Sequence, residues 1–189
     1  MNKQVLLIGR NPMVLSNLAS ALADEGFSVT MTKAVEQASQ EFNGTDFDLV
    51  AFGRGVDEAA NAQLRADFLA QNPNLIFVDG LAPIISLLVQ QIKQALAENL
   101  VHEKMLAEFT CQQADCLRVR ATVTAACQLT IDLYQLDEVH NTRQKTLVSN
   151  FFPAGSHTFS IEMVPETNST IKFLVAQANN RDLMVLPLR

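Results

Sequence analysis

The chain has 189 residues, of which 48% are hydrophobic and 18% charged, a composition typical of a folded globular protein and not of a disordered one. Its net charge of -6 at pH 7 and its pI near 5.0 argue against a nonspecific binder of nucleic acid or of anionic membranes, because neither surface attracts a net anion. Three cysteines without Cys-x-x-Cys spacing predict reduced thiols, with no disulfide framework, no metal site and no cofactor: Cys111, Cys116 and Cys127.

Apolar runs long enough for export or membrane insertion are not found in the sequence. The run from Val5 to Ile8 is too short for the core of a signal peptide. The longest apolar stretch, 81–89, is interrupted by Pro83 and falls far short of the ~20 residues that cross a bilayer. We therefore expect a cytoplasmic protein with no membrane anchor.

The first part of the chain alternates short apolar runs with helical periodicity, which predicts an α/β domain with a parallel sheet. A strand at 5–8 leads to Asn11, a good N-cap, and to Pro12, which suits the first helical position. Gly26 can end this helix in the left-handed conformation. Further strands are expected at 27–31, 47–52 and 75–78, and further helices at 34–42 and 56–70.

A long helix is predicted after the fourth strand. From Pro83 onward, apolar residues recur at i, i+4 spacing as far as Leu100, and we expect the helix to reach Glu108. Its first half would pack on the sheet, and its second half would project as a connector. A homodimer through the 84–108 helix is one interpretation, and packing within one chain is an equally good one.

Beyond Cys111 the hydrophobic period changes to two, which predicts strands with one solvated face. Strands are expected at 117–124, 129–134, 159–163, 171–175 and 183–188. Several short strands with turn residues between them indicate a small all-β antiparallel sandwich. The sequence thus predicts two domains, 1–108 and 112–189.

The first hundred residues resemble a response-regulator receiver domain. The resemblance is carried by the strand-to-Pro12 turn, the stretch 28–38 and the segment Phe47-Asp48-Leu49-Val50. It implies a truncated flavodoxin-like sheet, since the chain passes from Asp79-Gly80 to its long helix without the family's fourth helix or fifth strand. The family's lysine on that fifth strand has no clear match.

By the same resemblance, the residues of the family's phosphorylation pocket are replaced. The acidic pair that holds magnesium falls on Gly9 and Arg10, the acceptor aspartate on Gly53, and the threonine or serine of the fourth strand on or near Asp79. Magnesium needs oxygen ligands and phosphoryl transfer needs a carboxylate nucleophile, which glycine and arginine do not supply. We expect a pseudo-receiver that is not phosphorylated.

The replacement suggests a candidate anion site. Arg10 and Arg54 follow neighbouring strands at the edge where open α/β sheets bind ligands, beside the helix that begins after Asn11. One alternative is that either arginine pairs with Asp79, and another is that both reach solvent or a nearby carboxylate. A dinucleotide site is not expected, because only the first glycine of Gly-x-Gly-x-x-Gly is present, at Gly9.

Residues from about 115 to the end resemble small immunoglobulin-like modules related to flagellar hook-capping proteins and secretion-sorting tails. The resemblance is carried by 128–134, 153–161 and 173–175. It implies binding of other proteins through sheet faces or edge strands. Four cations are candidates for a polar face: Arg118, Arg120, Lys172 and Arg181.

No catalytic constellation is found, so we expect no enzymatic activity. The three histidines are scattered in polar surroundings, and no serine or cysteine has a recognisable nucleophile context. The function that we expect is a phosphorylation-independent interaction or scaffold component of bacterial signalling or motility, with a protein partner. The alternative is a sensor that binds an anionic small ligand at Arg10, Asn11, Arg54 and Asp79.

Overall fold

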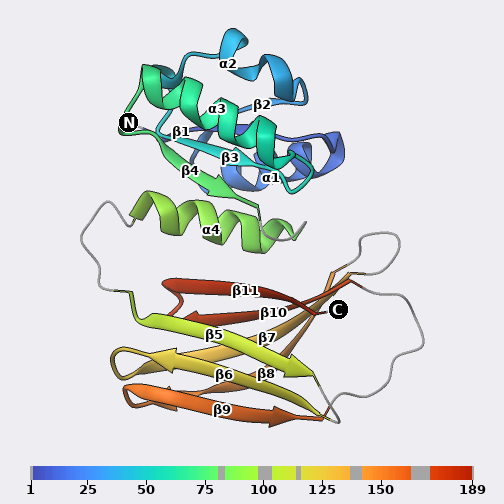
Figure 1. The fold of residues 1–189 in the computed structure, drawn as a ribbon, viewed down its shortest axis with the longest axis vertical. Coiled ribbons are helices and arrows are strands. Elements are labelled where there is room, and N and C mark those ends of the chain that lie inside the picture. Colours follow the sequence, from blue (N-terminus) through green and yellow to red (C-terminus); the bar gives the residue numbers. More distant parts are fainter. Residues whose placement is uncertain are drawn as a thin grey trace. The chain divides into compact units, whose positions relative to one another are not determined.

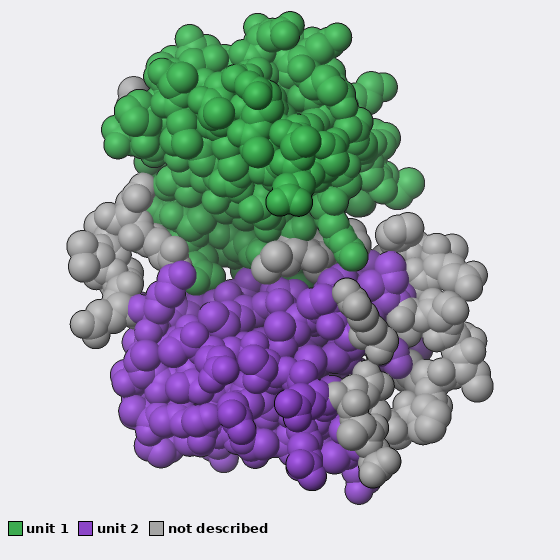
Figure 2. Space-filling model, viewed as in Figure 1, with its two compact units in different colours: residues 1–101 green, residues 102–189 purple. Residues whose placement is uncertain are grey.

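The computed structural model describes residues 2–80, 84–97, 104–113, 116–136, 142–162 and 171–188. The chain divides into two compact units, residues 1–101 and 102–189 (Figures 1 and 2). Each unit contains its own hydrophobic core.

The first unit is built on a four-stranded parallel sheet, as the sequence predicts. Its strand order is β2-β1-β3-β4. Its strands are β1 Gln4–Ile8, β2 Ser28–Thr32, β3 Leu49–Phe52 and β4 Ile76–Asp79. The α-helices are α1 Pro12–Asp24, α2 Ala38–Glu41, α3 Glu58–Gln71 and α4 Ile85–Ala97. Two 3₁₀ turns, Val35–Gln37 and Gly44–Asp46, complete the elements.

Local sequence signals set the ends of these helices. The Asn11 side chain caps α1, and Gly26 follows it with φ of 87°, as predicted. Asp57 caps α3 by accepting a hydrogen bond from the N–H of Ala60. The predicted 34–42 helix is split into a 3₁₀ turn and the one-turn helix α2.

Helices cover both faces of the parallel sheet, so alternate residues of β1 enter different cores. Val5 and Leu7 pack with residues of α1 and α4, whereas Leu6 and Ile8 pack with residues of α3. In Figure 1, α3 and α4 lie on opposite sides of the strands. Three of the buried residues of α4 belong to the core that contains Val5 and Leu7: Leu88, Val89 and Ile92.

The prediction that the long helix reaches Glu108 is wrong. Residues Leu106–Gln113 form the strand β5, which pairs with β6 in the second unit. Pro83 and residues 98–103 lie outside the described residues. Leu106 and Phe109 are both buried in the sheet core because the pairing register shifts between Leu106 and Glu108, and this burial outweighs the helical spacing that the preceding leucines suggested.

The second unit consists of two antiparallel sheets with strand orders β11-β10-β7-β8 and β5-β6-β9. The further strands are β6 Leu117–Val123, β7 Cys127–Leu136, β8 Thr142–Phe152, β9 Gly155–Ile161, β10 Ile171–Ala178 and β11 Asp182–Leu188. Sequence periodicity predicted five of the strands and missed β5 and β8. Strand β8 lies at a sheet edge and is mostly exposed, so its sequence carries no alternating pattern.

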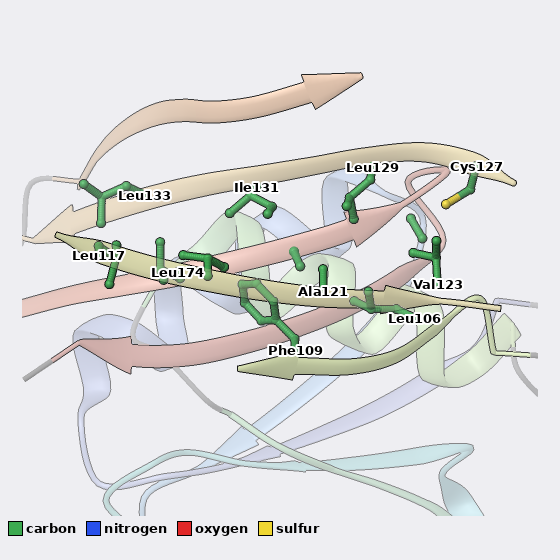
Figure 3. Packing of buried hydrophobic residues seen from close by; sticks show 13 residues of the cluster. Leu106, Phe109, Leu117, Ala121, Val123, Cys127, Leu129, Ile131, Leu133 and Leu174 are labelled. Atoms are coloured by element: carbon green, nitrogen blue, oxygen red, sulfur yellow. The ribbon is translucent and has the colours of Figure 1, made fainter. Parts of the chain in front are cut away.

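Both sheets contribute side chains to one core (Figure 3). In β6, Leu117, Val119, Ala121 and Val123 are buried, while Arg118 and Arg120 between them are exposed. Residues of β7 and β10 complete the core, among them Leu129, Ile131, Leu133 and Leu174.

Candidate functional site

Three glycines end three neighbouring strands of the parallel sheet. Gly9 follows β1, Gly53 follows β3 and Gly80 follows β4. Each glycine N–H donates to a carbonyl of the adjacent strand: Gly9 to Thr32 at 3.1 Å, Gly53 to Ile8 at 2.8 Å and Gly80 to Phe52 at 2.8 Å. The hydrogen-bond ladder of the sheet thus continues one residue beyond the strands. Because the N–H groups of these three glycines donate within the sheet, they are not available to bind an anion.

Of the three glycine positions, Gly80 is the most closely packed. A Cβ atom at Gly53 would lie 3.4 Å from Cα of Gly9, and one at Gly9 would lie 3.6 Å from Cα of Gly53. A Cβ atom at Gly80 would lie 3.1 Å from the carbonyl oxygen of Phe52 and 3.0 Å from Leu88 Cδ2. A side chain at Gly80 would therefore meet close contacts, whereas Gly9 and Gly53 leave the strand ends without side chains where the resemblance had placed an acidic pocket.

Arg10 is engaged by two carboxylates on other elements. Its Nη2 lies 2.6 Å from Glu36 Oε1 and 3.3 Å from Asp57 Oδ2, and its Nε donates to the carbonyl of Gly55. The hydrogen bond with Glu36 raises the pKa of Arg10 and lowers the pKa of Glu36. Of the alternatives open at the sequence level, pairing with a nearby carboxylate is the one that the structure shows for Arg10.

The amino terminus of α1 is satisfied from within the chain. Asn11 Oδ1 accepts from the N–H of Met13 at 3.0 Å and of Val14 at 3.3 Å, and Pro12 has no N–H. The N–H of Leu15 donates to the carbonyl of Asn11. Asn11 thus acts as a helix cap, and this helix terminus has no free donor in its first turn for a bound anion.

Asp79 pairs with Arg65, not with Arg10 or Arg54. Arg65 Nη2 lies 2.7 Å from Asp79 Oδ2, and Asn61 Nδ2 donates to Asp79 Oδ1 at 2.8 Å. Asn61 also accepts from Arg65 Nε at 2.6 Å. Asn61 and Arg65 are four residues apart on α3, so they share one helix face and both reach Asp79 at the end of β4.

Arg65 is a contributor to this region that the sequence analysis missed. Its guanidinium carbon lies 5.3 Å from the ring centre of Phe52 and 4.9 Å from that of Phe77, whose rings are stacked. The stacking and the pair with Asp79 hold the guanidinium in a fixed orientation. Its helical spacing from Asn61 was visible in the sequence, but its aromatic neighbours come from two separate strands.

Arg54 differs from Arg10 and Arg65 because it makes no ion pair with any residue that the structure describes. It borders two hollows in the first unit. One, of about 440 Å³, lies toward α3 and includes Asn61, Arg65 and Asp79. The other, of about 510 Å³, lies toward α1 and α4 and includes the glycines of the strand ends. Of the predicted site residues, Arg10, Asn11 and Arg54 border the second hollow, and Arg54 and Asp79 border the first.

The four cations that were candidates for one polar face are not on one sheet. Arg118 and Arg120 lie on the exposed face of β6 beside a small hollow of about 180 Å³. Lys172 belongs to β10 in the other sheet, and Arg181 follows that strand in the turn to β11. The expectation of a single four-residue face is therefore wrong, and only the pair on β6 remains.

The acidic, histidine and cysteine side chains do not form a metal cluster in the described part of the chain. Within those ranges, no group of three or more His, Cys, Asp or Glu side chains has a geometry that could hold a metal ion. The ring of His157 is hydrogen-bonded to the carbonyl of Pro153, while His102 and His140 lie outside the described residues. None of the described helices has both the length and the hydropathy of a membrane span.

No protein-family model and no curated protein matches the chain. Similar solved structures include the receiver domain of the hybrid histidine kinase CckA, with 21% identity over 49% of this chain and 98% of that one and a TM-score of 0.37. The lactose-specific IIB domain of the Streptococcus pneumoniae phosphotransferase system shows 16% identity over 55% and 100%, with a TM-score of 0.36. An NAD kinase of Archaeoglobus fulgidus shows 10% identity over 98% and 90%, also at 0.36.

Proposed function

We propose that this protein is a phosphorylation-independent, protein-binding component of bacterial signalling or motility, and that it is not an enzyme. The proposal makes the first unit a pseudo-receiver and the second an immunoglobulin-like β-sandwich that holds a partner protein. We place it in the cytoplasm. A homodimer is a further part of the proposal, restricted to Ile85–Ala97 of the original 84–108 segment because residues 106–108 belong to β5.

The observation that carries the proposal is the set of glycines at the ends of β1, β3 and β4. A phosphorylated receiver needs a carboxylate nucleophile beside a magnesium ion, and Gly9 and Gly53 supply neither. Three acids near this region are ion-paired: Glu36 and Asp57 with Arg10, and Asp79 with Arg65. A receiver-like sheet with glycines in place of the acids of the phosphorylation pocket is best explained by a binding role.

The experiment is incubation of the full chain with acetyl phosphate and magnesium, followed by intact mass measurement and acid treatment. We expect an unchanged mass, and we expect capture of any partner by the immobilised full chain to be the same with and without the phosphodonor. The positive control, treated in parallel, is a receiver domain of another protein that is known to accept a phosphoryl group from acetyl phosphate. A stoichiometric, labile adduct on this chain would contradict the proposal.

A second candidate function, sensing of an anionic small ligand, is favoured by one specific observation. Arg54 stands beside a hollow of about 510 Å³ without a carboxylate partner among the described residues. This hollow lies at the carboxyl ends of the parallel strands, where α/β sheets commonly bind ligands. The two functions are compatible, because the residues that line this hollow belong to the first unit alone and the proposed partner binds the second.

A further inference from the structure

The hollow between the strand ends and helices α1 and α4 has the composition of a small-molecule pocket. Its volume of about 510 Å³ lies within the range of roughly 300–1,000 Å³ that such pockets show. Leu15 and Leu88 line it with apolar side chains, and Gly9, Gly53 and Gly80 line it with main chain. Leu15 and Leu88 are themselves buried in the core of the first unit, so these walls are preformed.

Most polar groups around this pocket already have partners. The glycine N–H groups donate within the sheet, and the first turn of α1 is capped by Asn11. Arg10 is held by Glu36 and Asp57. A phosphate group, which needs several donors to replace its hydration shell, would find few of them here.

Of the charged side chains that the structure describes around this pocket, Arg54 is the one without an ion pair, and it offers a planar guanidinium with several donors. A guanidinium matches one carboxylate in a bidentate geometry, and a carboxylate needs fewer donors than a phosphate. The apolar walls would be left in contact with water unless the rest of the ligand were apolar too. The pocket therefore requires two properties of a ligand, one terminal carboxylate and one apolar body.

We propose that this pocket binds a small amphipathic monocarboxylate, with its carboxylate on Arg54 and its apolar body against Leu15, Leu88 and the glycine main chain. This inference rests on the second candidate function and specifies its ligand class. It is independent of the protein-binding proposal, because it needs neither the second unit nor the absence of phosphorylation. The two can fail separately.

The test is a titration of the isotope-labelled full chain with 3-phenylpropionate. Binding is monitored through the amide and methyl NMR signals of the chain. We expect saturable shifts of the amides of Gly9, Gly53 and Gly55 and of the methyl groups of Leu15 and Leu88. The neutral analogue 3-phenylpropanamide has the same apolar body and should bind at least about tenfold more weakly, because it cannot form the charge-assisted pair. Inorganic phosphate should produce no saturable shift of these signals.

Two matched variants make the test specific. Arg54→Gln should weaken 3-phenylpropionate about tenfold, as expected for loss of one charge-assisted hydrogen-bonded pair worth ~1.4 kcal/mol. Arg118→Gln removes an exposed arginine from β6 and should leave the affinity unchanged. Three results would overturn the inference: no saturable shift with 3-phenylpropionate, equal affinity for the amide, or an Arg54→Gln variant that binds as the natural chain does. A normal amide spectrum of Arg54→Gln verifies that a loss of binding is not a loss of fold.

Discussion

Replacement of Gly80 by alanine tests the close packing of the strand ends. The new methyl group would lie 3.0 Å from Leu88 Cδ2 and 3.1 Å from the carbonyl oxygen of Phe52. That oxygen accepts the N–H of Gly80 itself at 2.8 Å, so it cannot move away without lengthening a hydrogen bond of the sheet. Overpacking of this kind costs about 1–3 kcal/mol.

The matched control is Gly53→Ala, because its Cβ atom would lie 3.4 Å from Gly9 Cα and 3.6 Å from the carbonyl oxygen of Ile8, which are ordinary contacts. Neither Gly53 nor Gly80 has a positive φ, so the backbone accepts alanine at both positions. We expect Gly53→Ala to change stability by less than about 1 kcal/mol, since reduced entropy of the unfolded chain offsets small packing costs.

The two units can be followed separately during denaturant unfolding. The described helices all lie in the first unit, so helical circular dichroism reports its unfolding. The chain has no tryptophan and one tyrosine, Tyr134 on β7, whose fluorescence reports the second unit. Gly80→Ala should lower the midpoint of the helical transition and leave the Tyr134 transition unchanged. A Gly80→Ala variant as stable as Gly53→Ala would refute the packing argument.

Three further predictions concern the same unit. In a double-mutant cycle, the effects of Gly9→Ala and Gly53→Ala on the free energy of unfolding should be non-additive by about 0.5–3 kcal/mol, because each new Cβ atom would contact the other glycine's Cα. Additive changes in the free energy of unfolding would contradict this. Asn11→Ala should cost about 0.5–2 kcal/mol of unfolding free energy and Asn11→Asp much less, since aspartate still caps the helix. Partial burial by itself would raise the pKa of Asp48, but the hydrogen bonds from Lys3 and the N–H of Gln4, together with the charge of Lys3, lower it below its usual range. Its stabilising contribution should therefore be present above the unfolded-state pKa of about 3.9 and be lost as pH falls below it, so Asp48→Asn should flatten the acid limb of a stability-versus-pH curve.

Much of the first unit could be predicted from its sequence because local signals and burial agree there. The apolar runs of β1 and β3 and the Asn11-Pro12 start of α1 each specify one conformation. The exposed edge strand β8 carries no such pattern, because Thr142–Lys145 and Ser149–Phe151 face solvent on both sides of the strand. A strand of this kind is defined by its pairing with β7, which sequence periodicity does not contain.

The candidate site was only partly predictable for a related reason. The position of Arg10 and Arg54 beyond the strand ends follows from the order of the elements, and the structure places both beside one hollow. The partners of Arg10 come from positions 26 and 47 residues away, so its ion pairs depend on the tertiary fold. The same applies to Arg65, whose aromatic neighbours lie on β3 and β4.

The central claim is that the ends of β1 and β3 offer no carboxylate site for a divalent cation, and paramagnetic NMR with Mn²⁺ tests it most directly. Manganese replaces magnesium at carboxylate sites and broadens the signals of nearby nuclei. The account predicts that the amide signals of Gly9 and Gly53 are broadened no more than those of Gly155, a glycine of the second unit, at the same concentration of Mn²⁺. Selective and saturable broadening at Gly9 and Gly53 would contradict it.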